Sequence, residues 1–293
     1  MKTIGGQAVI EGVMMKSRRG WTVAVRGHGG EIHIKREPLG EPPALLRLPL
    51  LRGVAALYHA LALGIKALEF SANKAYEAEA GKPMGRFATA LTIGAAMLLG
   101  IGLFILLPLY MTKLIGMGFP AVSEGAFLFN LVDGLIRVAA FLLYIWAIGR
   151  WAEMRRVFEY HGAEHKVINA YEAGSPLRPE DVAPFSVRHP RCGTSFLLIV
   201  MVLSIVVFSF IPQKWPLIYK FSGRLLLIPA VAGLSYELLR LSARKKENPL
   251  MRLLTAPGLF LQGLTTREPD SGQIEVAIKA LEEALSFEEK DAR

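Results

Sequence analysis

One uninterrupted apolar stretch, ATALTIGAAMLLGIGLFILLPLYM at residues 88–111, decides the fold class. It contains no charged residue. A bilayer core of about 30 Å is crossed by roughly 20 consecutive, mainly apolar helical residues, and this stretch exceeds that length. The sequence therefore predicts an integral membrane protein, in keeping with a composition that is 52% hydrophobic and only 20% charged.

Three more apolar segments follow this first span. Residues 126–149 are equally long, although they carry polar side chains. Residues 195–211 are short and stop before a proline, and residues 225–241 are interrupted by Pro229. The last two segments either both span or form a re-entrant pair, and in both cases the chain returns to the side from which it entered. We expect a mainly α, multi-pass helical membrane protein.

Lysine and arginine are distributed unevenly between the loops. They are frequent before the first span, in residues 150–194 and after the last segment, whereas residues 112–125 contain a single basic residue, Lys113. Because cytosolic loops collect basic residues, both termini and the middle loop are predicted to be cytosolic, at the cytoplasmic membrane. The same rule explains the net charge of +9. The expected partners are therefore the lipid bilayer and an unknown substrate, and no nucleic acid is expected.

The N-terminal region reads as a small β element. Residues 21–26 and 31–36 alternate apolar and polar side chains around a glycine-rich turn, which predicts a hairpin. Residues 5–15, framed by glycines, are predicted to form one strand.

From about residue 50 to 75 the pattern is helical, with polar residues every seven positions. We expect an amphipathic helix on the membrane surface or packed against the spans, with a transmembrane helix as the alternative.

These features divide the chain into six segments. The last of them contains an amphipathic helix that starts near Asp270. The predicted segments are a cytosolic β-rich element (1–40), the interfacial helix (41–87), the first two spans (88–149), a cytosolic His/Cys segment with a metal-type loop (150–194), the third and fourth membrane segments (195–241) and a cytosolic C-terminal segment (242–293).

The side chains that could carry chemistry collect in the His/Cys segment. His161 and His165 are four residues apart, so on a helix they lie on one face at the spacing with which two imidazoles hold one metal ion. Residues 161–165 also match the H-x-x-E-H pattern of inverted zinc peptidases, in which the carboxylate, here Glu164, acts as general base. Asn169 and Glu172 extend the helix face that carries the two histidines, and they are candidates to orient the imidazoles.

A second pair of ligand-type residues precedes the third membrane segment. His189 and Cys192 are separated by two residues, and half of the six histidines together with the one cysteine fall between residues 161 and 192. We predict a divalent metal, with zinc the first choice, bound by His161, His165, His189 and Cys192. A complete tetrad would make a closed structural site, whereas loss or displacement of Cys192 would leave the open position that catalysis needs.

Polar residues also occur inside the predicted spans. Asn130, Asp133 and Arg137 recur about one turn apart, and charges in a bilayer are costly unless they face the bundle interior. They either line a polar pathway or form a neutralised pair that fixes helix packing. Glu237, near the cytosolic end of the last segment, is a spare carboxylate ligand or base, or the partner of a nearby arginine.

Four strings of residues resemble a known family: GGQAVIEGVMM at 5–15, EYHGAEHK at 159–166, HPRCGTS at 189–195 and LTTREP at 264–269. In these strings, and over nearly the whole chain, the sequence resembles the YqhQ-like bacterial membrane family, domain of unknown function 1385. That family is described as predicted metal-dependent enzymes, so the resemblance implies a metal site. It also implies that Glu11 and Gln7 lie near the metal ligands.

The sequence as a whole predicts a metal-dependent hydrolase that cleaves an amide or ester at the cytosolic membrane surface, with Glu164 as general base. Two alternatives belong to other classes. In one, the same ligands form a structural zinc clasp without catalysis, and removal of the metal unfolds the protein. In the other, the chain is a transporter component that uses Asn130, Asp133 and Arg137. We find no internal repeat of the kind that many transporters show.

Overall fold

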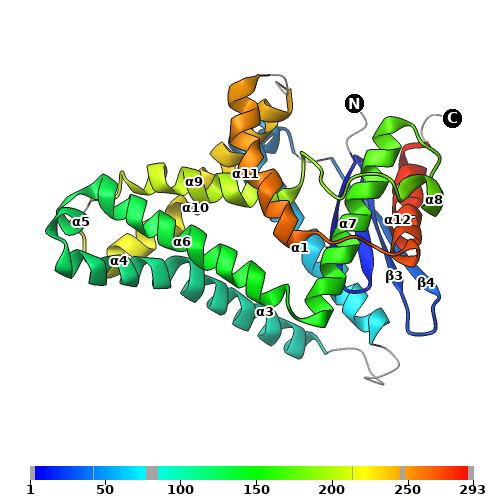
Figure 1. Cartoon of the computed structure of the whole chain (residues 1–293), viewed down its shortest axis with the longest axis horizontal. Coiled ribbons are helices and arrows are strands. Elements are labelled where there is room, and N and C mark those ends of the chain that lie inside the picture. Colours follow the sequence, from blue (N-terminus) through cyan, green and yellow to red (C-terminus); the bar gives the residue numbers. More distant parts are fainter. Residues whose placement is uncertain (1–3, 42, 77–84, 213, 245–247, 290–293) are drawn as a thin grey trace.

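The computed structural model describes residues 4–41, 43–76, 85–212, 214–244 and 248–289. The ends of several predicted segments, including 1–3, 77–84 and 245–247, lie outside these residues. The chain is elongated, with a bundle of long helices at one end and a small sheet covered by helices at the other (Figure 1). This arrangement confirms the mainly helical class with an N-terminal β element.

The sheet is an antiparallel meander in chain order, and Trp21 pairs with Glu37 in the predicted hairpin, which is confirmed. The prediction of a single strand over residues 5–15 is wrong, because this segment forms a second hairpin. Glu11 turns the chain with a positive φ of 49°. Gly12 lies so close to the third strand that a Cβ there would be 2.2 Å from the Ala24 oxygen. The strands are β1 (Gly5–Val9), β2 (Gly12–Lys16), β3 (Gly20–Arg26) and β4 (Ile32–Pro38).

Helices cover both faces of the sheet. Helices α7 (Ala152–Ala173) and α12 (Ser271–Glu289) pack on one face, where Met15 joins a buried apolar core with both helices. Helix α1 (Leu51–Ala75) covers the other face, where Leu63 and Ala67 pack beside Trp21. Burial of apolar surface on both faces explains why a four-stranded sheet is stable here.

The predicted C-terminal helix is confirmed, including its start. The Gln273 backbone N–H donates to the Asp270 carboxylate at 2.7 Å, and the Asp270 N–H donates to the Gln273 side chain at 2.9 Å. This reciprocal pair is a capping box, which satisfies two backbone donors at the helix start. The predicted apolar face, represented by Leu281, is buried against the sheet and α7.

The bundle contains the predicted membrane segments. Four helices among the described residues are long and apolar enough to cross a membrane: 51–75, 87–118, 126–148 and 217–242. In the second of these none of the apolar window is buried inside the protein, as expected of a surface that faces lipid. The elements are α3 (Arg86–Ile101), the π turn η2 (Gly102–Leu106), α4 (Leu107–Gly118), α5 (Pro120–Glu124), α6 (Ala126–Ile148), α9 (Gly193–Phe208) and α10 (Leu217–Arg244).

Several boundaries differ from the predictions. Helix α9 is short, as expected, but α10 begins at Leu217 and continues through Pro229, so it is long and apolar enough to cross a membrane by itself. A proline is tolerated in a membrane helix because neighbouring groups satisfy the freed backbone atoms. Helix α11 (Pro249–Thr265), between the bundle and the sheet, was not predicted. The remaining short elements are η1 (Ala44–Arg47) and α8 (Pro179–Val182).

Helix α1 is long and apolar enough to span a membrane, but it packs against both the bundle and the sheet. Its N-terminal part packs on α10, where Gly53 lies against Gly233, and its C-terminal part covers the sheet. Of the two arrangements that we expected for an amphipathic helix, the packed one is present. Helix α1 therefore connects the bundle to the sheet.

Candidate metal centre

Helix α7 presents two histidines on one face. The chain bends at residues 149–151 after α6, so α7 is a separate helix and not a straight continuation of the second span. His161 and His165 lie near its middle, with ring centroids 4.4 Å apart. The predicted helical placement of this pair is therefore confirmed, with the correction that α7 packs on the sheet.

Cys192 joins these histidines from a different part of the chain. It is the N-cap residue of α9, and its Sγ lies 3.2 Å from His161 Nε2. One ligand atom from each of His161, His165 and Cys192 lies within 4.8 Å of the other two. The structure thus brings together three of the four predicted ligands, which are separated by up to 31 residues.

Backbone carbonyls fix the orientation of both imidazoles. His161 Nδ1 lies 2.8 Å from the Thr265 oxygen, and His165 Nδ1 lies 2.6 Å from the Val187 oxygen. A carbonyl only accepts hydrogen bonds, so each Nδ1 carries the proton and each Nε2 keeps its lone pair. Nε2 of His165 is buried without a hydrogen-bond partner among the described residues. An oriented imidazole with a free Nε2 is the arrangement of metal-bound histidines, so these residues fit a divalent ion.

His189 flanks this cluster and is not part of it. Its ring centroid lies 5.8 Å from that of His165. The Gln262 side chain forms two hydrogen bonds with the backbone of His189, both 2.9 Å long. The Nε2 atom of His189 faces Glu172 at 3.7 Å, and Glu172 also pairs with Arg191. Glu172 therefore lies beside His189, while its role in orienting an imidazole and the role of His189 as a ligand both remain predictions.

Glu164 is buried between α7 and β1. Its side chain contacts Gly6, where an added Cβ would lie 3.0 Å from the Glu164 Cγ. Burial raises the pKa of the Glu164 carboxyl, while the neighbouring His161 and a hydrogen bond from the Gly6 backbone lower it in part. A carboxyl in such surroundings exchanges a proton nearer to neutral pH than an exposed one does, as a general base requires.

The segment 264–269 runs directly alongside α7. A Cβ on Gly162 would lie 2.0 Å from the Arg267 oxygen, so only glycine allows this approach. The Arg267 N–H donates to the Phe158 carbonyl at 2.9 Å. This contact brings the Thr265 carbonyl to His161. Thus the segment 264–269, which carries one of the family-like strings, is part of the site.

The two residues that the resemblance implied, Glu11 and Gln7, form contacts around the sheet. Glu11, in the turn between β1 and β2, forms a double hydrogen bond with Arg156 at 2.5 Å and lies 3.4 Å from the Tyr160 hydroxyl. The side chain of Gln7 lies against Gly64 of α1. Each therefore has a partner in the packing of the sheet, and the implied place of both near the metal ligands stays a prediction.

Two further accessory candidates, Asn169 and Glu237, form contacts that stabilise the fold. Asn169 donates to the carbonyls of Ser186 and Arg188, at 2.8 and 3.1 Å, so it holds the chain before His189. Glu237 forms an ion pair with Arg52 of α1, with an Nε–Oε1 distance of 2.6 Å. The prediction that Glu237 supplies a ligand or base is not supported by this geometry.

The polar residues of the second span form a closed network. Asp133 accepts hydrogen bonds from Arg137 and Arg224, both at 2.6 Å. Asn130 accepts from Arg224 at 3.0 Å, and Arg137 donates to Ser204 at 2.6 Å. All five side chains are buried. Arg224 was missed because it directly precedes the predicted segment 225–241, whereas α10 begins at Leu217 and includes it.

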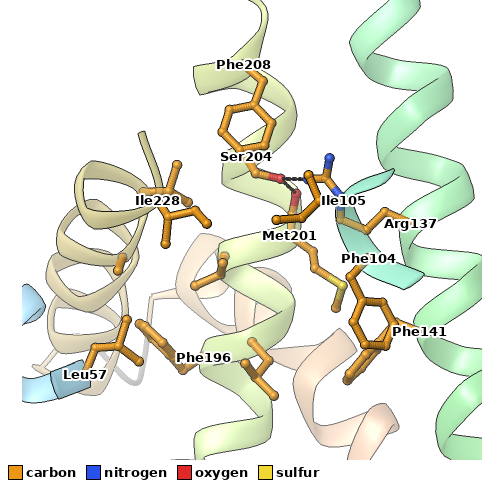
Figure 2. A pocket seen from close by; sticks show the side chains of 14 residues that line it. Leu57, Phe104, Ile105, Arg137, Phe141, Phe196, Met201, Ser204, Phe208 and Ile228 are labelled. Carbon is orange, nitrogen blue, oxygen red and sulfur yellow. Dashed lines mark hydrogen bonds between the residues drawn. The ribbon is translucent and has the colours of Figure 1, made fainter. Parts of the chain in front are cut away.

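Beside this network the bundle contains a groove of about 400 Å³. Figure 2 shows α9 along its length, with Leu57 and Ile228 on one side and Phe104 and Phe141 on the other. Apart from Arg137 and Ser204 its lining residues are apolar. A polar pathway needs continuous polar lining, so among the described residues the network fits the expected packing role better than a transport path.

These features define a class. The chain is a multi-pass helical membrane protein with a His/His/Cys cluster where its bundle meets a sheet.

The chain belongs to the family described as Protein of unknown function (DUF1385), whose pattern matches residues 48–287. It is 35% identical over 303 aligned positions to the uncharacterized protein YqhQ of Bacillus subtilis (strain 168), and the alignment covers 97% of this chain and 92% of that relative. No solved structure matches the chain. The predicted family is thereby confirmed. Neither description names a metal or a reaction, so the metal dependence that the resemblance implied stays a prediction.

Proposed function

We propose that this chain is a divalent-metal-dependent hydrolase of the membrane surface, with zinc bound by His161, His165 and Cys192. The proposal rests on the convergence of these three ligand atoms within 4.8 Å, together with carbonyls that leave the lone pair of each histidine on Nε2. Three protein ligands are the set found in catalytic zinc sites, which keep one position open. The lysine and arginine distribution predicts that the site faces the cytosol.

In this proposal the metal ion, Glu164 and two backbone carbonyls have separate roles in the reaction. A bound divalent ion would supply a Lewis acid that polarises the carbonyl of an amide or ester. Glu164 would accept the proton of the attacking water, since its burial raises the pKa of its carboxyl. Thr265 and Val187 hold His161 and His165 in place through their carbonyls.

A cleft next to the cluster offers a place for the substrate. It measures about 460 Å³ and is lined in part by Gly6, Gln7, Lys16, Arg18 and Arg191. Gly6 contacts Glu164, and Arg191 immediately precedes Cys192, so the cleft adjoins the cluster. Three basic side chains at its wall favour a substrate that carries a negative charge near the scissile bond.

The first experiment is to quantify metals in the full chain purified in detergent. We expect about one ion per chain, lost in a His161→Ala/His165→Ala variant. A His33→Ala/His59→Ala variant is the matched control, because these histidines lie on β4 and α1, and it should keep the ion. A wild-type protein without stoichiometric metal would overturn the proposal.

A second variant separates binding from catalysis. Glu164→Gln should keep the metal, because Glu164 is not among the clustered ligands. It should lower hydrolysis by about 100-fold or more, the usual contribution of a general base. Hydrolysis at the wild-type rate would show that another group takes the proton.

A structural zinc clasp is the second candidate function, and burial favours it. His165 is 1% exposed and Cys192 is 7% exposed, and the hydrogen bonds of His161 join α7 to the start of α9 and to the end of α11. A clasp predicts that a chelator lowers the unfolding temperature sharply, and that Glu164→Gln changes neither metal content nor any activity. An enzyme predicts loss of hydrolysis in that variant.

A further inference from the structure

A separate cleft of about 530 Å³ lies where α6 ends and α7 begins. Its lining is Gly149, Arg150, Arg155 and Arg267. Arg150 lies in the bend between the two helices and Arg155 in the first turn of α7, whereas Arg267 lies in the segment that follows α11. Two arginines that are close in sequence and a third from more than 100 residues further on therefore line the same cleft.

The charge in this cleft is only partly balanced. Arg155 lies 3.4 Å from Glu159, and the Arg150 guanidinium stacks on the ring of Trp146, 4.0 Å from its centroid. In the described part of the chain neither Arg150 nor Arg267 forms an ion pair. Converging cations of this kind attract an anion, and arginine is suited to phosphate because its planar fork donates two parallel hydrogen bonds.

The position of the cleft indicates where the phosphate comes from. Trp146, near the end of α6, is 49% exposed, and Trp151, just beyond that end, is 65% exposed. Exposed tryptophans at the end of a span mark the level of the lipid head groups. Helix α6 is also one of the helices long and apolar enough to cross the membrane. The cleft therefore opens at the depth at which phospholipids carry their phosphates.

We propose that this cleft binds the phosphate of an anionic phospholipid head group. Basic pockets at the membrane boundary recognise such head groups, and each basic residue near the surface adds attraction. The proposal is independent of the metal centre, since it rests on the arginines, the cleft and the tryptophans alone. The rival explanation is that these arginines follow only the charge rule for cytosolic loops and hold no particular lipid.

The test uses the full chain in detergent, titrated with phosphatidylglycerol, with phosphatidylcholine or with inorganic phosphate. The readouts are the unfolding temperature and the lipid retained in native mass spectrometry. The test variant is Arg150→Gln/Arg267→Gln. The control variant, Arg36→Gln/Arg178→Gln, removes the same charge from β4 and from the start of α8, where each arginine has an acidic partner.

We expect phosphatidylglycerol to raise the unfolding temperature of the wild type and the control, and phosphatidylcholine to have a much smaller effect. The test variant should bind phosphatidylglycerol more weakly by about fivefold for each arginine removed. If the double variant does not fold, the two single variants are measured, each with a loss of about fivefold. Equal binding by the test and control variants would overturn the proposal. If inorganic phosphate alone reproduced the full stabilisation, the lipid assignment would be wrong.

Discussion

The replacement Gly162→Ala tests the packing on which the metal centre depends. The new Cβ would lie 2.0 Å from the Arg267 oxygen, far inside van der Waals contact, and the obstructing atom belongs to the backbone. The segment 264–269 must therefore move away from α7. Such a movement lengthens the Arg267–Phe158 hydrogen bond of 2.9 Å and the His161–Thr265 hydrogen bond of 2.8 Å.

The expected magnitude follows from these two bonds. Each contributes about 1 kcal/mol net, and more where a buried partner stays unsatisfied, so their loss costs about 2–4 kcal/mol. Alanine in place of glycine inside a helix gains about 1 kcal/mol. The net loss is therefore about 1–3 kcal/mol. Because His161 loses the acceptor that orients it, metal affinity should fall by about 10–100-fold.

The assay measures thermal unfolding and metal content of the full chain in detergent. Gly263→Ala is a matched control, since it is also helical and the nearest atom to its new Cβ, on Arg188, is 3.8 Å away. The control should be as stable as the wild type or slightly more so. If Gly162→Ala behaved like the control, with full metal content, the argued contact between α7 and segment 264–269 would be refuted.

Two more replacements probe other parts of the fold. Gln262→Ala removes both hydrogen bonds to the backbone of His189 and should lower the free energy of unfolding by about 2–3 kcal/mol. An unchanged unfolding temperature would show that other contacts hold the loop around His189. Asp133→Asn leaves Arg137 and Arg224 without their buried counter-charge and should destabilise the bundle by about 3–5 kcal/mol. A variant that unfolds at the wild-type temperature would contradict the network role and would reopen the transport alternative.

The parts of the fold that the sequence predicts are those under strong local constraints. A long apolar helix is recognisable because a bilayer leaves its backbone no other solution. The glycine-rich turn before Glu31 and the cap at Asp270 are short signals whose partners lie within a few residues. The pairing of His161 with His165 likewise depends only on helical spacing.

The missed elements carry no such local signal. The turn of the first hairpin places a positive φ on Glu11, where sequence reasoning expects glycine or asparagine. Helix α11 contains Pro257, which usually ends a helix. The groups that orient the imidazoles are carbonyls of Thr265 and Val187. Every residue has a carbonyl, so no residue type marks which ones are used.

The position of α12 on the sheet has a consequence for biosynthesis. The four strands leave the ribosome first, and α12, which covers the face around Met15, leaves among the last described residues. Translation at about 5–20 residues per second separates the two events by many seconds. During that interval the hydrophobic helices can enter the membrane and α7 can cover part of this face, but the area over β2 and β3 that α12 covers stays exposed. We therefore expect nascent chains that stall before residue 271 to recruit chaperones through this uncovered face.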